Sequence, residues 1–89
     1  MISKLRKSFR RDFARLPKKV QDRAREAYRH FLRDPSHASL AFKRLNTELP
    51  LWSVRITESY RAVGVRDREL IIWFFIGTHA QYERLLSQI

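Results

Sequence analysis

The sequence LWSVRITESYRAVGVRDRELIIWFFIGTHAQYERLL, residues 51–86, contains three strand-like runs followed by a short helical pattern. In the first run, residues 51–57, apolar and polar side chains alternate with the period of a half-buried strand. The second run, residues 60–65, follows a gap so short that only a hairpin fits, which predicts antiparallel neighbours. The third run, residues 70–76, has no polar residue and is predicted to be a strand covered on both faces.

The final helix is predicted from a capping box. Thr78 is followed three residues later by Gln81, so the hydroxyl can accept a hydrogen bond from the Gln81 amide while the glutamine side chain reaches back. An apolar stripe with helical spacing comes next, formed by Tyr82, Leu85, Leu86 and Ile89. We therefore expect a short C-terminal helix that packs on the sheet, with His79 in its first turn.

Two helices are predicted before the strands. The first has an apolar face made of Leu5, Phe9, Phe13 and Leu16, and it ends before Pro17. The second begins at Pro17, and its apolar stripe consists of Val20, Ala24, Ala27, Tyr28, Phe31 and Leu32. It ends at Asp34, because the residue before a proline is disfavoured in the α region. The two stripes are expected to pair as an αα-hairpin on one face of the sheet.

The predicted fold class is α+β, with an N-terminal α-hairpin packed on a twisted antiparallel sheet of three or four strands and a short C-terminal helix. Residues 1–4 are expected to be either a short edge strand or frayed. Residues 35–50 are expected to form a connector in which Leu40, Phe42 and Leu45 dock. The length of 89 residues and the lack of internal repeats indicate a single domain, residues 1–89.

The composition argues against several kinds of site. The chain has no cysteine, so a disulfide or a thiolate metal site is impossible, and its three scattered histidines do not form a zinc motif. We expect no metal and no cofactor. The basic N-terminus leads into no apolar segment, so we expect neither a signal peptide nor a membrane anchor, and a cytoplasmic location.

The charge balance indicates an anionic partner. The chain has 19 Lys and Arg against 9 Asp and Glu, a formal net charge of +10, which is typical of proteins that meet nucleic acid or an acidic protein. Fourteen of these 19 cations precede residue 45, in the predicted helices and the connector. The residues that we expect to contact RNA phosphates are Lys18, Lys19, Lys43 and Arg44.

Most enzyme templates are missing from the sequence. There is no glycine-rich phosphate loop, no HExxH motif, no cysteine nucleophile and no clustered carboxylate pair. The remaining candidates are Arg55, Arg61, His79 and Tyr82. This set suits metal-free cleavage of RNA through its own 2′-hydroxyl, in which the protein removes one proton, offsets charge on the phosphorane and protonates the leaving 5′-oxygen.

Several segments together resemble the RelE/ParE superfamily of small basic bacterial toxins from type II toxin–antitoxin systems. The segments are SVRI at 53–56, YRAVGV at 60–65, IIWFFIGTHAQYERLL at 71–86 and LPKKVQDRAREAYRHFLRDPSHASLAFKRL at 16–45. The resemblance implies an α-hairpin on a twisted antiparallel sheet. In the RelE branch it implies cleavage of mRNA on the ribosome, and in the ParE branch it implies poisoning of DNA gyrase instead.

The resemblance also implies roles for residues and partners. Arg61 matches the arginine that stabilises the scissile phosphate, Tyr82 or His79 matches the C-terminal group for proton transfer, and Arg55 matches a basic position on the preceding strand. The chain departs from RelE in having Trp52 and Ser53 where RelE has more lysine. The implied partners are an acidic cognate antitoxin, mRNA on the ribosome, and operator DNA only through the antitoxin complex. We expect a segment of the antitoxin to lie along the sheet or the helices and to cover the arginines, and we expect no membrane partner.

Structural roles compete with the catalytic ones. A strand arginine is most often solvated, and Arg61 shares its strand face with Val63 and Val65, which places it at the edge of an apolar patch beside the last helix. His79 could instead stabilise its helix turn. Tyr82 could bury its ring between sheet and helix with the hydroxyl at the rim. A basic binding module without catalytic activity therefore remains an alternative to the nuclease.

Overall fold

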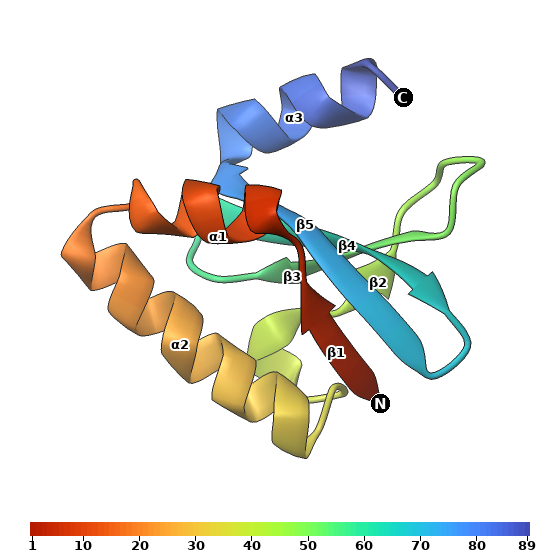
Figure 1. The fold of residues 1–89 in the computed structure, drawn as a ribbon, viewed down its shortest axis with the longest axis horizontal. Coiled ribbons are helices and arrows are strands. Elements are labelled where there is room, and N and C mark those ends of the chain that lie inside the picture. The colour runs from red at the N-terminus through yellow and green to blue at the C-terminus, as the bar shows by residue number, and fades with distance from the viewer.

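The computed structural model describes all residues, 1–89. The chain forms five strands, three α-helices and one short 3-10 helix. In chain order these are β1 (Ile2–Leu5), α1 (Lys7–Ala14), α2 (Lys18–Arg33), η1 (Ala38–Leu40), β2 (Lys43–Arg44), β3 (Leu51–Arg55), β4 (Tyr60–Asp67), β5 (Leu70–Thr78) and α3 (His79–Ser87). Figure 1 shows α1 and α2 following one another at one side of the sheet, while α3 projects beyond the end of β5. The predicted α+β class, with two N-terminal helices and a short C-terminal helix, is confirmed.

The sheet contains more strands than the sequence predicted. Its order is β1-β5-β4-β3-β2, and the pairs from β2 to β5 are antiparallel as expected. The N-terminal residues form an edge strand, β1, which runs parallel to β5 and makes the sheet mixed. Leu5 therefore belongs to β1, although its spacing from Phe9 matched a helix face, and α1 is a helix of only eight residues.

Ser3 fixes β1 in place. Its Oγ accepts hydrogen bonds from the Tyr28 hydroxyl at 2.9 Å and from Trp73 Nε1 at 3.0 Å. The Ile2 amide also donates to the Glu69 carbonyl, and the Arg6 amide donates to the Trp73 carbonyl. These partners come from α2, from β5 and from the turn before β5, so the parallel pairing depends on contacts between segments that are distant in the sequence.

The sheet has a hydrophobic core on each face. The larger core, between the sheet and the N-terminal helices, contains Phe31, Val54, Ala62, Trp73 and Ile76 among its members. The smaller core, between the sheet and α3, contains Leu45, Leu51, Val63 and Tyr82. Adjacent residues of β5 contribute to opposite cores, which confirms that this strand is covered on both faces.

A β-bulge changes the alternation along β5. Val63 pairs with Phe75 and Gly64 pairs with Trp73, so Phe74 is an extra residue on β5. The bulge reverses which residues of β5 face the N-terminal helices, from Ile71 and Trp73 before it to Ile76 after it. As a consequence Gly77, directly opposite Arg61, faces α3.

The connector between α2 and β3 docks through its apolar residues, as expected for Leu40 and Leu45, which are buried. Lys43 and Arg44 stay exposed, although they also form the short strand β2. At the start of the connector the Asp34 carboxylate accepts hydrogen bonds from the hydroxyl and amide of Ser36, which lower the pKa of Asp34. None of the helices has the length and apolar character needed to cross a bilayer.

Candidate functional site

Arg55 and Arg61 lie opposite one another at the hairpin end of β3 and β4. Arg55 is the last residue of β3, Arg61 is the second residue of β4, and the two are register partners. On its other side Arg61 pairs with Gly77 of β5. Because register partners on neighbouring strands project to the same side of a sheet, both guanidinium groups start from the α3 face. The sequence-based expectation that Arg61 lies beside the last helix is confirmed.

This arginine pair lacks an acidic partner. None of the ion pairs in the structure involves Arg55 or Arg61. Two like charges directly opposite one another on paired strands destabilise a sheet. The arrangement therefore costs stability in the free protein, and an anion bound between the two groups would relieve that cost.

The Arg61 side chain is held by the hairpin turn. Its Nη1 donates to the carbonyl oxygen of Thr57 at 2.6 Å, of Tyr60 at 3.1 Å and of Glu58 at 3.3 Å. A guanidinium has five N–H donors, and those on Nε and Nη2 make no hydrogen bond within the chain. Arg61 is thus held through Nη1, and its Nε and Nη2 can still donate hydrogen bonds to a ligand. Arg55 is exposed.

His79 and Tyr82 lie on the first turn of α3, next to this hairpin. The His79 amide donates to the Ser59 carbonyl at 2.8 Å, which joins the start of α3 to the β3–β4 turn. The His79 ring lies 5.7 Å from the Tyr82 ring, and its Nε2 is 3.2 Å from Glu83 Oε1. The His79–Glu83 contact spans one helical turn. His79 therefore supports its own helix, which was the structural alternative to a catalytic role.

The Tyr82 ring is buried in the core under α3, with 8% of the residue exposed. Its hydroxyl makes no hydrogen bond within the chain, and no enclosed side-chain polar atom lacks a partner. The hydroxyl therefore reaches the surface at the rim of the core. This geometry agrees with the structural alternative, in which Tyr82 buries its ring between sheet and helix. The hydroxyl at the rim is still accessible to a ligand.

The N-terminus of α3 is satisfied by the chain itself. The predicted capping box is present, because the Gln81 amide donates to Thr78 Oγ1 at 3.1 Å and the Thr78 amide donates to Gln81 Oε1 at 2.8 Å. The Gln81 side chain occupies the space that a Cβ of Gly77 would need. The start of α3 thus has few free N–H groups, so an anion at this face would be bound by Arg55 and Arg61 rather than by the helix.

The four predicted RNA-contacting residues are divided between different surfaces. Lys43 pairs with Ser53 and so shares the face of the arginine pair, whereas Arg44 pairs with Trp52 and projects to the opposite face. Lys18 and Lys19 lie in the first turn of α2, where Lys18 Nζ is 2.7 Å from Asp22 Oδ1. The sequence alone could not show which face of the sheet Lys43 and Arg44 occupy, because the register of the two-residue strand β2 is set by its pairing with β3.

Sequence reasoning also missed an apolar groove under the N-terminal helices. The apolar stripes of α1 and α2 pack on the same face of the sheet and touch one another, as the predicted αα-hairpin requires, but they leave a space between them. A cavity of about 320 Å³ opens between them, and Arg10 and Arg25 are the charged residues in its lining. No sequence signal marked this site, because the apolar stripes that line it are also those expected of a closed core.

Comparisons with known proteins place the chain in a family. A family model for the ParE-like toxin domain matches residues 18–84, and no curated protein sequence matches. Among solved structures, a chain of the RelB–RelE antitoxin–toxin complex of Methanococcus jannaschii is 14% identical with a TM-score of 0.75, and the match covers 92% of this chain and 96% of that chain.

Two further structures share the fold at low identity. The RelBE2 toxin–antitoxin complex of Mycobacterium tuberculosis is 23% identical with a TM-score of 0.68, covering 88% of this chain and 96% of that chain. YafQ from E. coli is 12% identical with a TM-score of 0.72, covering 90% and 94%. Since the family model spans all the elements from α2 to most of α3, the chain belongs to the ParE-like toxin domain family.

Proposed function

We propose that this protein is the toxin of a type II toxin–antitoxin system and that it stops translation by cutting mRNA on the ribosome. The observation that supports the nuclease most directly is the arginine pair Arg55–Arg61, two opposed cations without an acidic partner. His79 and Tyr82 begin the helix beside it. Such a face suits a group that gains negative charge, as a phosphorane does.

The proposed reaction uses the RNA as its own nucleophile. The 2′-oxygen forms a bond to phosphorus, the bond from phosphorus to the 5′-oxygen breaks, the 2′-hydroxyl loses a proton and the 5′-oxygen gains one. Arg55 and the free nitrogens of Arg61 offset charge on the phosphorane. His79 and Tyr82 are the two groups of the set that can exchange protons, one serving as base and the other as acid.

We also propose an acidic antitoxin as the protein partner, with operator DNA reached only through that complex. Two arguments support it. The chain carries a net charge of +10, and similar folds from Methanococcus jannaschii, Mycobacterium tuberculosis and Pyrococcus horikoshii were solved as toxin–antitoxin complexes.

The nuclease is tested by inducing the protein alone in cells and sequencing RNA 5′ ends. New 5′ ends within coding sequence are expected, together with growth arrest. Arg61→Ala and Tyr82→Phe should reduce both by on the order of a hundredfold, the scale for losing one transition-state contact. Arg23→Ala, at an exposed position on α2, serves as the control and should behave as the unchanged protein. Arrest that persists unchanged in the Arg61 and Tyr82 variants would show the catalytic assignment to be wrong.

The second candidate function is inhibition of DNA gyrase, because the family model that matches is the ParE-like one. In that case purified protein should inhibit supercoiling in vitro while cellular mRNA stays whole. A third outcome, silent overexpression with tight binding of an acidic partner, would support a basic binding module without either activity.

A further inference from the structure

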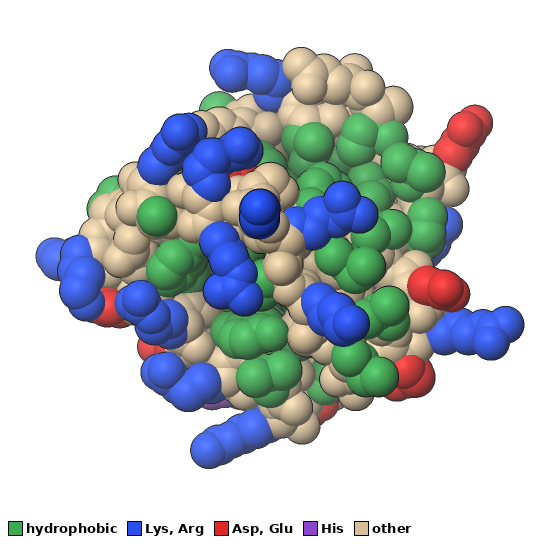
Figure 2. Space-filling view, in the orientation of Figure 1, with side chains coloured by type: hydrophobic (Ala, Val, Ile, Leu, Met, Phe, Trp, Pro, Cys, Tyr) green, Lys and Arg blue, Asp and Glu red, His purple; other side chains and the backbone are tan.

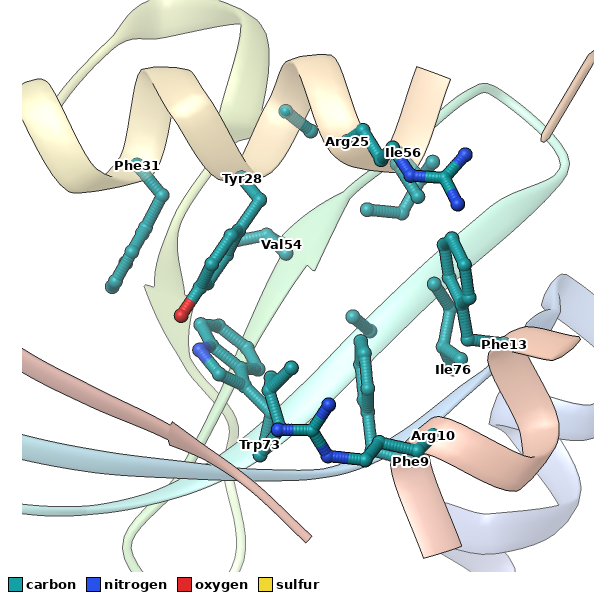
Figure 3. Close-up of a pocket in the computed structure, with 14 residues that line it drawn as sticks. Phe9, Arg10, Phe13, Arg25, Tyr28, Phe31, Val54, Ile56, Trp73 and Ile76 are labelled. Carbon is teal, nitrogen blue, oxygen red and sulfur yellow. The ribbon is translucent and has the colours of Figure 1, made fainter. Parts of the chain in front are cut away.

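A second pocket lies where the end of α1 approaches the start of α3. Its volume is about 300 Å³, and four of its nine lining residues are hydrophobic. It differs from the groove between α1 and α2, which Figure 3 shows and in which two arginines are set among twelve hydrophobic residues. The polar residues of the second pocket include Asp12 and Arg15 from the end of α1 and Thr78 and Gln81 from the start of α3. A lining of this mixed kind selects a ligand by its hydrogen-bonding groups.

Asp12 and Arg15 present opposite charges to this pocket without neutralising one another. They are one helical turn apart, yet no ion pair joins them, and Arg15 has no acidic partner. Asp12 is paired only with Arg11, whose Nε lies 3.4 Å from Asp12 Oδ1. A ligand in the pocket therefore meets a carboxylate that accepts hydrogen bonds and, beside it, a guanidinium that donates them.

The carboxylate of Asp12 restricts which part of a ligand the pocket can hold. Figure 2 shows Lys and Arg side chains spread over the face that carries α1 and α2, with few carboxylates among them. The chain attracts polyanions as a whole, but a phosphate placed against Asp12 would be repelled. The group opposite Asp12 should therefore be an uncharged donor, such as the N–H groups of a nucleobase.

The pocket also has aromatic walls and lies next to the arginine pair. Tyr60 from β4 and Phe75 from β5 line it, and nucleobases stack on side chains of this type. Phe75 and Gln81 also fill the space above Gly77, since an added Cβ there would lie 2.9 Å from Phe75 Cζ. Gly77 is the register partner of Arg61. The residues that wall the pocket thus lie beside the proposed phosphate site.

Guanine is the RNA base whose hydrogen-bonding groups match this lining. Its N1–H and its 2-amino group are neighbouring donors that suit a carboxylate, and its O6 and N7 are neighbouring acceptors that suit a guanidinium. Adenine and cytosine each present one amino group next to an acceptor, and uracil presents one N–H between two carbonyls. None of these three bases offers a carboxylate two neighbouring donor atoms.

We infer that this pocket binds a guanine base. Asp12 accepts hydrogen bonds from N1–H and the 2-amino group, and Arg15 donates to O6 or N7. The ring stacks against the aromatic wall of Tyr60 and Phe75. Placing this base in the RNA that is cut, next to the phosphate held at Arg61, rests on the proposed function, whereas binding of guanine does not.

Titration of the full chain with the four ribonucleoside 5′-monophosphates, followed by ¹H–¹⁵N NMR, tests the choice of base. All four carry the same phosphate, so general attraction to a chain at +10 cancels in the comparison. GMP should bind at least about tenfold more tightly than AMP, CMP or UMP, the scale of one bidentate contact to a base. It should also shift the amide signals of Asp12 and Gln81. Equal affinities, or shifts confined to other residues, would overturn the inference.

Two matched pairs of variants test the location. Asp12→Asn should reduce the preference for GMP over AMP to below about threefold, because the amide group no longer accepts from both donors. Asp67→Asn makes the same change in charge at an exposed position outside the pocket and should keep the full preference. Arg15→Gln should weaken GMP binding by about tenfold, and Arg23→Gln, exposed on α2, by less than about threefold. An unchanged preference in Asp12→Asn, or equal losses within either pair, would contradict the assignment.

Sequencing of RNA 5′ ends then separates this pocket from the nuclease. Guanine should be enriched at one fixed position beside the cut, and Asp12→Asn should remove that enrichment whereas Asp67→Asn should keep it. Selective binding of GMP without any RNA cleavage would sink the proposed nuclease and leave the pocket. Cleavage by a chain that does not prefer GMP would sink the pocket and leave the nuclease. Cleavage without guanine enrichment by a chain that does prefer GMP would show that the bound base is not part of the cut RNA.

Discussion

Arg61 differs from an ordinary solvated strand arginine in how it is held. Three turn carbonyls bind its Nη1, and no carboxylate neutralises it, so its charge remains available at a fixed place. A guanidinium can serve the turn and a phosphate at once because its donors form a planar fork, which a lysine ammonium lacks. The side chain thus has a structural role and a proposed catalytic role, each through different nitrogens.

Arg55 should be a residue whose removal stabilises the protein. Replacing one of two opposed cations by an anion converts repulsion across β3 and β4 into attraction, so Arg55→Glu should raise the free energy of unfolding by about 0.2–1 kcal/mol. The same change should abolish mRNA cleavage, because the carboxylate would repel the phosphate. Urea unfolding and the count of RNA 5′ ends give the two readouts. A variant that loses stability would show that the two arginines do not oppose each other in solution.

At the level of elements, β1 depends on one hydroxyl. Ser3→Ala leaves the Tyr28 hydroxyl and Trp73 Nε1 without their common acceptor, which should cost about 1–3 kcal/mol of unfolding free energy. Thermal unfolding followed by circular dichroism measures the loss. Ser59→Ala removes an exposed hydroxyl and should have little effect. Equal stability of the two variants would mean that β1 is held by its backbone pairing with β5 alone.

The start of α3 depends on the capping box, and α3 carries both His79 and Tyr82. Thr78→Ala should cost about 1 kcal/mol and fray the first turn of the helix. Faster amide hydrogen exchange at the start of α3 and weaker RNA cleavage are expected together, because the two candidate side chains lie in that turn. Ser87→Ala, at the other end of the helix, provides the control. Intact cleavage with a frayed first turn would contradict a catalytic role for His79.

At the level of the whole molecule, the charge of +10 should dominate contact with RNA. The logarithm of the affinity for single-stranded RNA should fall linearly with the logarithm of the salt concentration, by about 0.7 per phosphate contacted. Lys43→Ala should reduce that slope by about one such contact, because Lys43 shares the face of the arginine pair. Lys18→Ala should reduce it less, because Asp22 already pairs with this ammonium. An identical slope in the Lys43 variant would place the RNA elsewhere.

Local patterns in the sequence predicted a large part of this fold. The period-two run of β3, the uniformly apolar run of β5 and the capping box of α3 each follow from neighbours within a few residues. The candidate site was predictable only in part. The short hairpin predicted that the strands carrying Arg55 and Arg61 are neighbours, whereas nothing local indicated that Arg61 binds three carbonyls of that hairpin through one nitrogen.

The sequence by itself determined the α+β class, the helix boundaries near Pro17 and Asp34, and the excess of positive charge, because these depend on composition and on short-range periodicity. Only the tertiary structure decided that β1 pairs in parallel with β5, that a bulge at Phe74 turns Gly77 toward α3, and that α1 and α2 leave a groove between them. The physical reason is that each of these features arises from packing between segments far apart in the chain, where several registers satisfy the same local pattern equally well.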